Sequence, residues 1–508
     1  MLAWTIYISF IGVLVLMLLP RAAARAARII ALLTAVAGAV VALVGAMQQP
    51  DPGQVATIVK VPWIPSLGAD YFLAADGISL VLVVLTGLAA IAGILFSWNV
   101  EQRTKEFFAF YLALIGGVYG VFLSFDVLLL FVFYELTIVP KYFLIARWGS
   151  TRKEYGAMKL ALYSFVGSHL VLIGLIATWV VARAQTGGAT LNLMELSHVS
   201  FPLHFQRWVF PLMFVGFAVL AGLWPLHTWA PTGHVAAPTA GSMLLAGVVM
   251  KLGAYGCLRV AMTLFPEGVR MWQNEIAALA VIGIVYGAGV ALVQRDFKFV
   301  IGYSSVSHMG FVVLGLATLN RIGLSGAVLQ MFSHGIIAGL LFAVVGRMVY
   351  DRTHTRDFGE LQSMRLGQLL PFAGVTFVLA GAASMGLPGF SGFVAELQVL
   401  IGAWKTFPVA VPFTGAGIIV GVAYILRAWQ KAFYADTGKG WSASASPHDA
   451  AHETGAPWPP ISLPERAGAA LLLAASLAIG LFPWLLLNWI EPCLNSPLFE
   501  RLLKGGAP

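Results

Sequence analysis

The feature that most limits the fold of this chain is a succession of long apolar runs separated by short polar loops. A helix needs about 20 apolar residues to cross the hydrocarbon core of a bilayer, and about fourteen runs of suitable length are present. The runs lie at 2–19, 29–47, 78–98, 107–125, 127–147, 157–182, 208–230, 239–263, 275–294, 298–318, 328–350, 369–403, 408–434 and 467–491. We therefore expect an all-α polytopic membrane protein with about 14 transmembrane helices.

The composition excludes other classes of protein. Of the residues, 59% are hydrophobic and 10% are charged, whereas a soluble domain has roughly 25% charged residues. The net charge of +8 is spread over short loops, so we expect a lipid bilayer and no nucleic acid as partner. Cys257 and Cys493 are far apart and outside any CxxC motif. We expect no metal, no cofactor and no catalytic redox site in this chain.

The distribution of basic residues predicts the orientation. Most of the 30 Lys and Arg residues, such as Arg21, Arg152 and Arg356, fall in loops on one side. Loops rich in Lys and Arg stay in the cytoplasm. The bias therefore predicts a multi-pass protein whose two termini both face the periplasm.

Five ionisable residues lie at membrane depth: Glu135, Lys251, His308, His334 and Glu396. A charge at a helix centre costs about 2.5–3.5 kcal/mol on insertion scales, so each group requires a partner or a function. Carboxylate, amine and imidazole groups on neighbouring helices can form a proton relay. The alternatives are structural ion pairs with core histidines, and a haem between His308 and His334, which is weaker because each helix offers one histidine.

Two of the expected spans contain breaks. One reads FAVLAGLWPLHTWAPTGHVAAP and includes Pro225, and the other reads GAASMGLPGFSGFVAE and includes Pro388. Proline removes a helix hydrogen bond, and one broken helix in each half is typical of internal-repeat transporters. Simple packing kinks are the alternative.

Several motifs resemble one known family. The segments PLHTWAPTGHVAAPTAGSMLLAGVVMKLGAYGCLR, GYSSVSHMG, MFSHG and GLPGFSGFVAELQVLIGAW are similar to the antiporter-like membrane subunits of respiratory complex I. GRMVYDRTHTRDF is most similar to the bacterial NADH-quinone oxidoreductase M subunits, which are related to Mrp-type antiporter subunits. The resemblance extends from about residue 70 to 435.

The resemblance implies a domain organisation. It implies two inverted five-helix repeats and two broken helices. The segments would be N-terminal helices 1–3 at 1–106, a first repeat at 107–263, a second repeat at 275–434, and a cytoplasmic loop with a C-terminal helix at 435–508.

The resemblance also implies a function. The chain would be a proton-translocating, non-redox subunit of a bacterial NADH:quinone oxidoreductase in the inner membrane. Flavin, iron–sulfur clusters and quinone would be held by partner subunits, and L-like and N-like subunits would be its neighbours. Glu135, Lys251, His308, His334 and Glu396 match family positions that carry protons or couple subunits. The alternatives are an Mrp-type cation/proton antiporter subunit, and a non-pumping structural subunit of a complex I-like or hydrogenase assembly.

One position departs from the family pattern. Family members have a lysine seven residues before the histidine of the helix-7 motif, and this chain has Leu220 there. Three accounts are open: pumping is impaired, Lys141 substitutes for the missing amine, or water bridges Glu135 to Lys251. The simplest expectation for Lys141 itself is that it extends to the cytoplasmic interface.

Three further histidines are accessory candidates. His169 is expected to be a buried imidazole, either in a relay or in a hydrogen bond between helices. His227 and His234 flank the helix-7 break. They would either line a cavity there or cap the carbonyls that the break frees.

Overall fold

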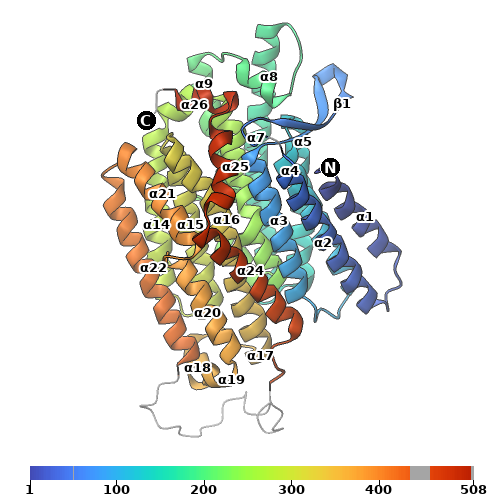
Figure 1. The fold of residues 1–508 in the computed structure, drawn as a ribbon, viewed down its shortest axis with the longest axis vertical. Helices are drawn as coiled ribbons and strands as arrows, with labels where there is room; N and C mark the ends of the chain where they lie inside the picture. The colour runs from blue at the N-terminus through green and yellow to red at the C-terminus, as the bar shows by residue number, and fades with distance from the viewer. Residues whose placement is uncertain (50, 435–457, 505–508) are drawn as a thin grey trace.

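The computed structural model describes residues 1–49, 51–434 and 458–504. These residues form a bundle of long helices with short elements at its two ends (Figure 1). Within the described ranges, twelve helices are long and apolar enough to cross a membrane, and Trp4–Leu18 and Pro371–Ser384 are shorter apolar helices. The prediction of an all-α polytopic membrane protein is confirmed.

The N-terminal part contains the shorter helix α1, two long helices, and one hairpin that the sequence analysis did not predict. Strands β1 and β2 pair antiparallel, with Val61 opposite Tyr71, and the hairpin stands at one end of the bundle (Figure 1). Its first strand, ATIVKVPWI, is rich in the β-branched residues that favour strands. The elements are α1 (Trp4–Leu18), α2 (Ala24–Met47), β1 (Ala56–Ile64), η1 (Pro65–Leu67), β2 (Ala69–Ala75) and α3 (Gly77–Phe96).

The middle of the chain forms two successive sets of helices. The first contains α4 (Thr104–Leu123), α5 (Val127–Leu136), α6 (Ile138–Trp148), α7 (Lys153–Thr186), α8 (Leu193–His198), α9 (Leu203–Ala221), α10 (Trp229–Ala236), α11 (Thr239–Leu244), η2 (Leu245–Val249), α12 (Met250–Gly256), η3 (Cys257–Met262) and α13 (Pro266–Met271). The second contains α14 (Gln273–Val293), α15 (Phe297–Ala317), α16 (Arg321–Ala343), η4 (Val344–Tyr350), α17 (Asp351–Thr353), α18 (Phe358–Ser363), α19 (Leu366–Leu369), α20 (Pro371–Ser384), α21 (Ser391–Thr406) and α22 (Ala410–Phe433).

The C-terminal part packs back onto the bundle. It contains α24 (Leu463–Leu481), α25 (Trp484–Leu494) and α26 (Pro497–Leu503). Glu465 on α24 is buried and bonds Arg347 at 2.5 Å and Arg352 at 2.8 Å, which ties α24 to η4 and α17. Residues 435–457 of the expected inner loop lie outside the described residues.

The two sets of helices contain the same capping arrangement. Asp126 and Asp296 each precede a helix, α5 and α15, and each accepts hydrogen bonds from the backbone N–H groups two and three residues later. Each aspartate also lies in an isolated backbone bridge, Asp126 with Asn192 and Asp296 with Asp357. Such capping oxygens satisfy N–H groups that have no partner within the helix.

The two helix breaks also share one geometry. Gly222 (φ 76°) and Gly386 (φ 70°) adopt the left-handed conformation that ends a helix most easily at glycine. After each glycine, the next N–H group returns to the carbonyl five residues earlier, from Leu223 to Ala218 at 3.1 Å and from Leu387 to Ala382 at 3.0 Å. The chain then turns before α10 and α21 begin. The second break leaves the carbonyl of Ser384 free to contact His308 Nε2 at 3.1 Å, although Leu387 and Pro388 in the turn are exposed.

Candidate functional site

Four of the predicted relay residues converge inside the bundle. Lys251 lies on α12, His308 on α15, His334 on α16 and Glu396 on α21. All four side chains are buried, between 0% and 8% exposed. They come from four helices, of which α15 and α16 are consecutive and α12 and α21 are distant in sequence, so the fold brings them together.

Lys251 begins this chain of contacts. Its Nζ atom lies 2.7 Å from His334 Nδ1 and also bonds the carbonyl of Ala246, five residues earlier. Ala246 belongs to the π-helical segment η2, and such wide turns are frequent at functional sites. The ring of His334 stacks on that of His308, with centroids 5.4 Å apart.

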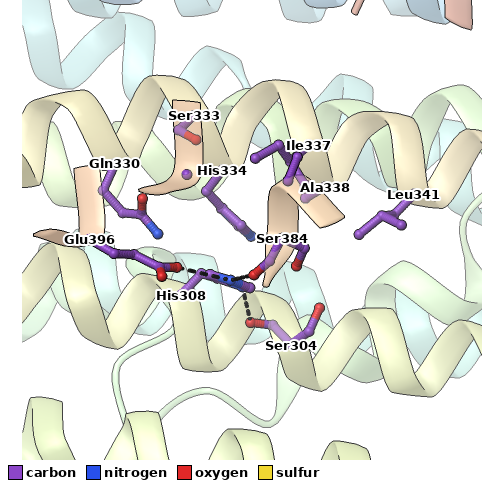
Figure 2. A pocket seen from close by; sticks show the side chains of 12 residues that line it. Ser304, His308, Gln330, Ser333, His334, Ile337, Ala338, Leu341, Ser384 and Glu396 are labelled. Atoms are coloured by element: carbon purple, nitrogen blue, oxygen red, sulfur yellow. Dashed lines mark hydrogen bonds and ion pairs between the residues drawn. The ribbon is translucent and has the colours of Figure 1, made fainter. Parts of the chain in front are cut away.

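His308 lies between His334 and the broken helix that carries Glu396. Its Nε2 atom lies 3.1 Å from the carbonyl of Ser384 and 3.5 Å from Glu396 Oε1, and its Nδ1 atom lies 2.8 Å from the carbonyl of Ser304 (Figure 2). A neutral imidazole donates from only one nitrogen, whereas an imidazolium donates from both. His308 can therefore hold a proton on either side.

A small cavity joins these groups. Gln330, Ser384 and Ser304 line it together with both imidazoles and Glu396 (Figure 2). Its volume for the centre of a water molecule is about 10 Å³, which is about the room that one water needs. A buried water needs two to four polar partners, and the serine, glutamine, imidazole and carboxyl groups of the lining can supply them.

The first half holds a different arrangement. Glu135 on α5 is half-buried, and its Oε1 atom is buried without a hydrogen-bond partner. Lys141 on α6 is 1% exposed, and its Nζ atom also has no hydrogen-bond partner. The expectation that Lys141 reaches the cytoplasmic interface was therefore wrong. Leu220 is buried among apolar neighbours.

The histidines at the helix-7 break have mainly aromatic neighbours. Pro225 lies inside the break between α9 and α10, as Pro388 lies between α20 and α21. The ring of His227 packs against Tyr286, with centroids 5.3 Å apart. His234 is fully buried, packs against Phe342 at 4.9 Å, and both of its ring nitrogens lack hydrogen-bond partners. His234 therefore caps no carbonyl.

His169 lies outside the interior. It is exposed on α7, and its Nδ1 atom lies 2.6 Å from the carbonyl of Phe165 in the same helix. The expectation of a buried imidazole was therefore wrong. It fails because an apolar helix sequence does not reveal which of its faces turns outward.

The sequence analysis did not predict the buried charge pair of Arg259 with Asp76. Arg259 on η3 bonds Asp76, which precedes α3, through two contacts of 2.6 Å. Burial alone would raise the pKa of Asp76, but the Arg259 guanidinium and the N–H group of Ser79 hold that pKa below its ordinary value. An arginine within the apolar run CLRVAM was the available sequence signal.

Comparison with known proteins identifies similar chains. Residues 124–420 match the family described as "NADH:quinone oxidoreductase/Mrp antiporter, TM". NADH-quinone oxidoreductase subunit M of Rhodobacter capsulatus is 36% identical over 438 residues, which are 85% of this chain and 82% of that protein.

Two solved structures have the same fold. A chain of respiratory complex I from Thermus thermophilus with bound NADH is 27% identical, with a TM-score of 0.86 over 99% of this chain and 100% of that chain. A chain of the Mrp complex from Dietzia sp. DQ12-45-1b is 20% identical, with a TM-score of 0.80 over 99% of this chain and 98% of that chain. At this identity the similarity indicates a common fold and not a common function.

Proposed function

This chain belongs to the subunit M family of the NADH-quinone oxidoreductase membrane arm, which is related to Mrp antiporters, and we propose that it moves protons through Lys251, His334, His308 and Glu396. It is a non-redox subunit of a proton-translocating enzyme. Protons would pass from the cytoplasmic side to Lys251 and then along the two imidazoles to Glu396. Glu135 would face a neighbouring subunit.

The observation that carries this proposal is the sequence of close contacts that joins the four groups in the order Lys251, His334, His308 and Glu396. The steps are 2.7 Å from Lys251 to His334, stacked rings to His308, and 3.5 Å from His308 to Glu396. The stacked step needs a mobile water or a ring rotation, and the polar cavity beside both rings has room for one water. His308 can accept a proton at one nitrogen and release one from the other.

The same proposal covers the location of the cofactors, the neighbouring subunits and the orientation of the termini. We propose that flavin, iron–sulfur clusters and quinone lie in other subunits and that L-like and N-like subunits are the membrane neighbours. Both termini would face the periplasm. The relationship to complex I subunits supports these assignments.

We also propose the division into 1–106, 107–263, 275–434 and 435–508, with two inverted repeats in the middle. The shared caps at Asp126 and Asp296 support it. So do the matching turns at Gly222 and Gly386.

The test is the number of protons moved per quinone reduced. The native assembly is purified, reconstituted into proteoliposomes and supplied with NADH and quinone. Lys251→Met and Glu396→Gln are expected to lower this proton ratio while quinone reduction continues. Lys504→Met is the control, because Lys504 is exposed and, among the residues that the structure describes, its side chain pairs with the exposed Glu500. An unchanged ratio in both relay variants would contradict the proposal.

A second candidate is a subunit that no longer pumps. Leu220 favours it, because the first half has no amine at that position and the side chain is buried. In that case Lys251→Met would leave the proton ratio unchanged and affect only assembly. The proton ratio of Lys251→Met distinguishes a pumping from a non-pumping subunit. The amount of this subunit in the purified complex shows whether the variant has assembled.

A further inference from the structure

Two ionisable side chains of opposite type lie in the first half, and each has a buried polar atom without a hydrogen-bond partner. Lys141 Nζ is buried and unpartnered, and Glu135 Oε1 is buried and unpartnered. The carboxylate is the group whose charge acts on the Lys141 amine. An isolated ammonium inside a membrane protein is costly, so a nearby carboxylate is its natural partner.

A helix break brings the two residues to the same region. In an ideal helix, positions 135 and 141 would be about 9 Å apart along the axis and about 120° apart around it. Here α5 ends at Leu136 and α6 begins at Ile138. The N–H group of Thr137 is shared between the carbonyls of Phe133 and Tyr134, at 3.3 and 3.2 Å. This tightened turn, with Pro140 following it, alters the relative direction of the two side chains.

An apolar layer separates this region from Lys251. The ring of Phe217 on α9 packs edge-on against Tyr134, with centroids 5.7 Å apart. The same Phe217 ring lies against Gly256 on α12, and the backbone of Phe217 lies against Gly253, where an added Cβ would be 2.5 Å from the Phe217 carbonyl oxygen. Leu220 is buried and gives no polar connection.

Glu135 lies at the outer side of the bundle, where α5 meets α6. Val132, Leu136 and Val139 are 40–51% exposed, and Glu135 lies beside them, half-buried. The carboxyl group therefore borders the outer face of the bundle. Lys141 lies behind it, in the interior.

We propose that Lys141 is the charge partner of Glu135 and that the two form a proton-holding pair that works separately from the Lys251 chain. In the ion-pair form, Glu135 is a carboxylate and Lys141 an ammonium. Transfer of one proton from the amine to the carboxylate gives a neutral pair with the same number of protons. Arrival of one further proton gives a carboxylic acid beside an ammonium, and its departure restores the ion pair.

This inference deepens the proposed function, because it assigns a second proton position to the same subunit. It is tested in the full assembly with Lys141→Met, Lys141→Arg, Glu135→Gln and the double variant Glu135→Gln/Lys141→Met. We expect Lys141→Met to cause a partial loss of protons per quinone reduced while quinone reduction continues. Lys141→Arg is expected to retain the ratio because it keeps the charge.

The double variant measures the interaction of the pair. If the two groups act as one unit, its loss equals that of either single variant rather than their sum. Lys159→Met is the matched control, because Lys159 is a partly buried lysine on the adjacent α7 that bonds Thr232. Assembly is checked for each variant by the amount of this subunit in the purified complex.

Two outcomes would overturn the inference: an unchanged ratio in Lys141→Met, or additive losses in the double variant. If Lys141→Met prevents assembly, the proton ratios of Lys141→Arg and Lys141→Gln are compared instead, because the first variant keeps the positive charge and the second removes it. The proposed function fails separately, when Lys251→Met leaves the ratio unchanged, because the two sites lie on opposite sides of the apolar layer.

Discussion

At the residue scale, the Asp76–Arg259 pair illustrates what a buried charge requires. Both side chains are buried, the two contacts are 2.6 Å, and Arg259 Nε also donates to Tyr255 Oη at 3.1 Å. Asp76→Ala would leave the guanidinium uncompensated and should lower the free energy of unfolding by about 3–5 kcal/mol. Denaturation of the purified subunit in mixed micelles measures this loss.

The double variant Asp76→Leu/Arg259→Met tests whether the uncompensated charge of Arg259 causes this loss of stability. Removing both charges together should recover most of the stability, because no buried charge remains without a partner. A double variant as unstable as Asp76→Ala would show that packing around Arg259, and not charge pairing, holds this region.

Asp126 gives a prediction about pH. Burial raises its pKa from 3.8 to about 6, although the N–H groups of Asp70, Leu128 and Leu129 partly offset that effect. The folded protein therefore binds the proton more tightly than the unfolded chain. Between pH 3.8 and about 6 this group's contribution to stability falls as pH rises, by about 3 kcal/mol in total.

Asp126→Asn should remove this contribution, because asparagine keeps the capping oxygen and does not titrate. The measurement is the difference in free energy of unfolding between wild type and variant from pH 4 to pH 8. A difference that does not change with pH across this window would refute the assignment.

At the element scale, the break between α20 and α21 positions Glu396. Gly386 has a φ of 70°, and a Cβ there would lie 2.8 Å from Glu396 Oε2. Gly386→Ala should therefore move the carboxyl group and lower the proton ratio, and its backbone strain costs about 1–2 kcal/mol.

Gly389→Ala is the matched control for this prediction. Gly389 also has a positive φ, of 100°, but a Cβ there meets nothing within 4 Å. Its backbone strain should be at least as large, because a φ of 100° lies outside the left-handed region that alanine can adopt, and it should keep the proton ratio. Equal proton ratios in the two variants would show that backbone strain alone explains the effect, and not the contact with Glu396.

The positions of the helices could be predicted from the sequence more accurately than the side on which each helix packs. Lys251, His308, His334 and Glu396 could be named because an ionisable group at membrane depth requires an explanation. Lys141 was predicted to reach the cytoplasmic interface, but its side chain is buried one helical turn after the tight turn at Thr137 that joins α5 and α6.

Other features depended on contacts distant in sequence. The exposure of His169 follows from which face of α7 packs against α9, and the sequence of α7 alone does not encode that choice. The hairpin β1–β2 has a β-branched first strand, but its partner strand, ADYFLAA, has no such pattern, so the pairing could not be predicted from the sequence.

At the scale of the whole molecule, the two ends of the bundle carry different elements. The hairpin and α8 lie at one end, joined by the ion pair of Lys60 with Glu195 at 3.7 Å, and α26 lies there too (Figure 1). Arg103 and Lys153 border one cavity in the loops at the opposite end. The excess of basic residues in these opposite loops predicts that they face the cytoplasm.

Impermeant maleimide labelling of single cysteines tests this orientation in intact cells. Cys257 and Cys493 are buried, so the native thiols should stay unlabelled. Lys60→Cys on β1 is expected to react from outside, since its side chain is 42% exposed, whereas Lys153→Cys should react only after the membrane is opened. The reverse pattern would place both termini in the cytoplasm. It would also reverse the direction of proton movement proposed along the chain from Lys251 to Glu396, since the access sides of these groups would be exchanged.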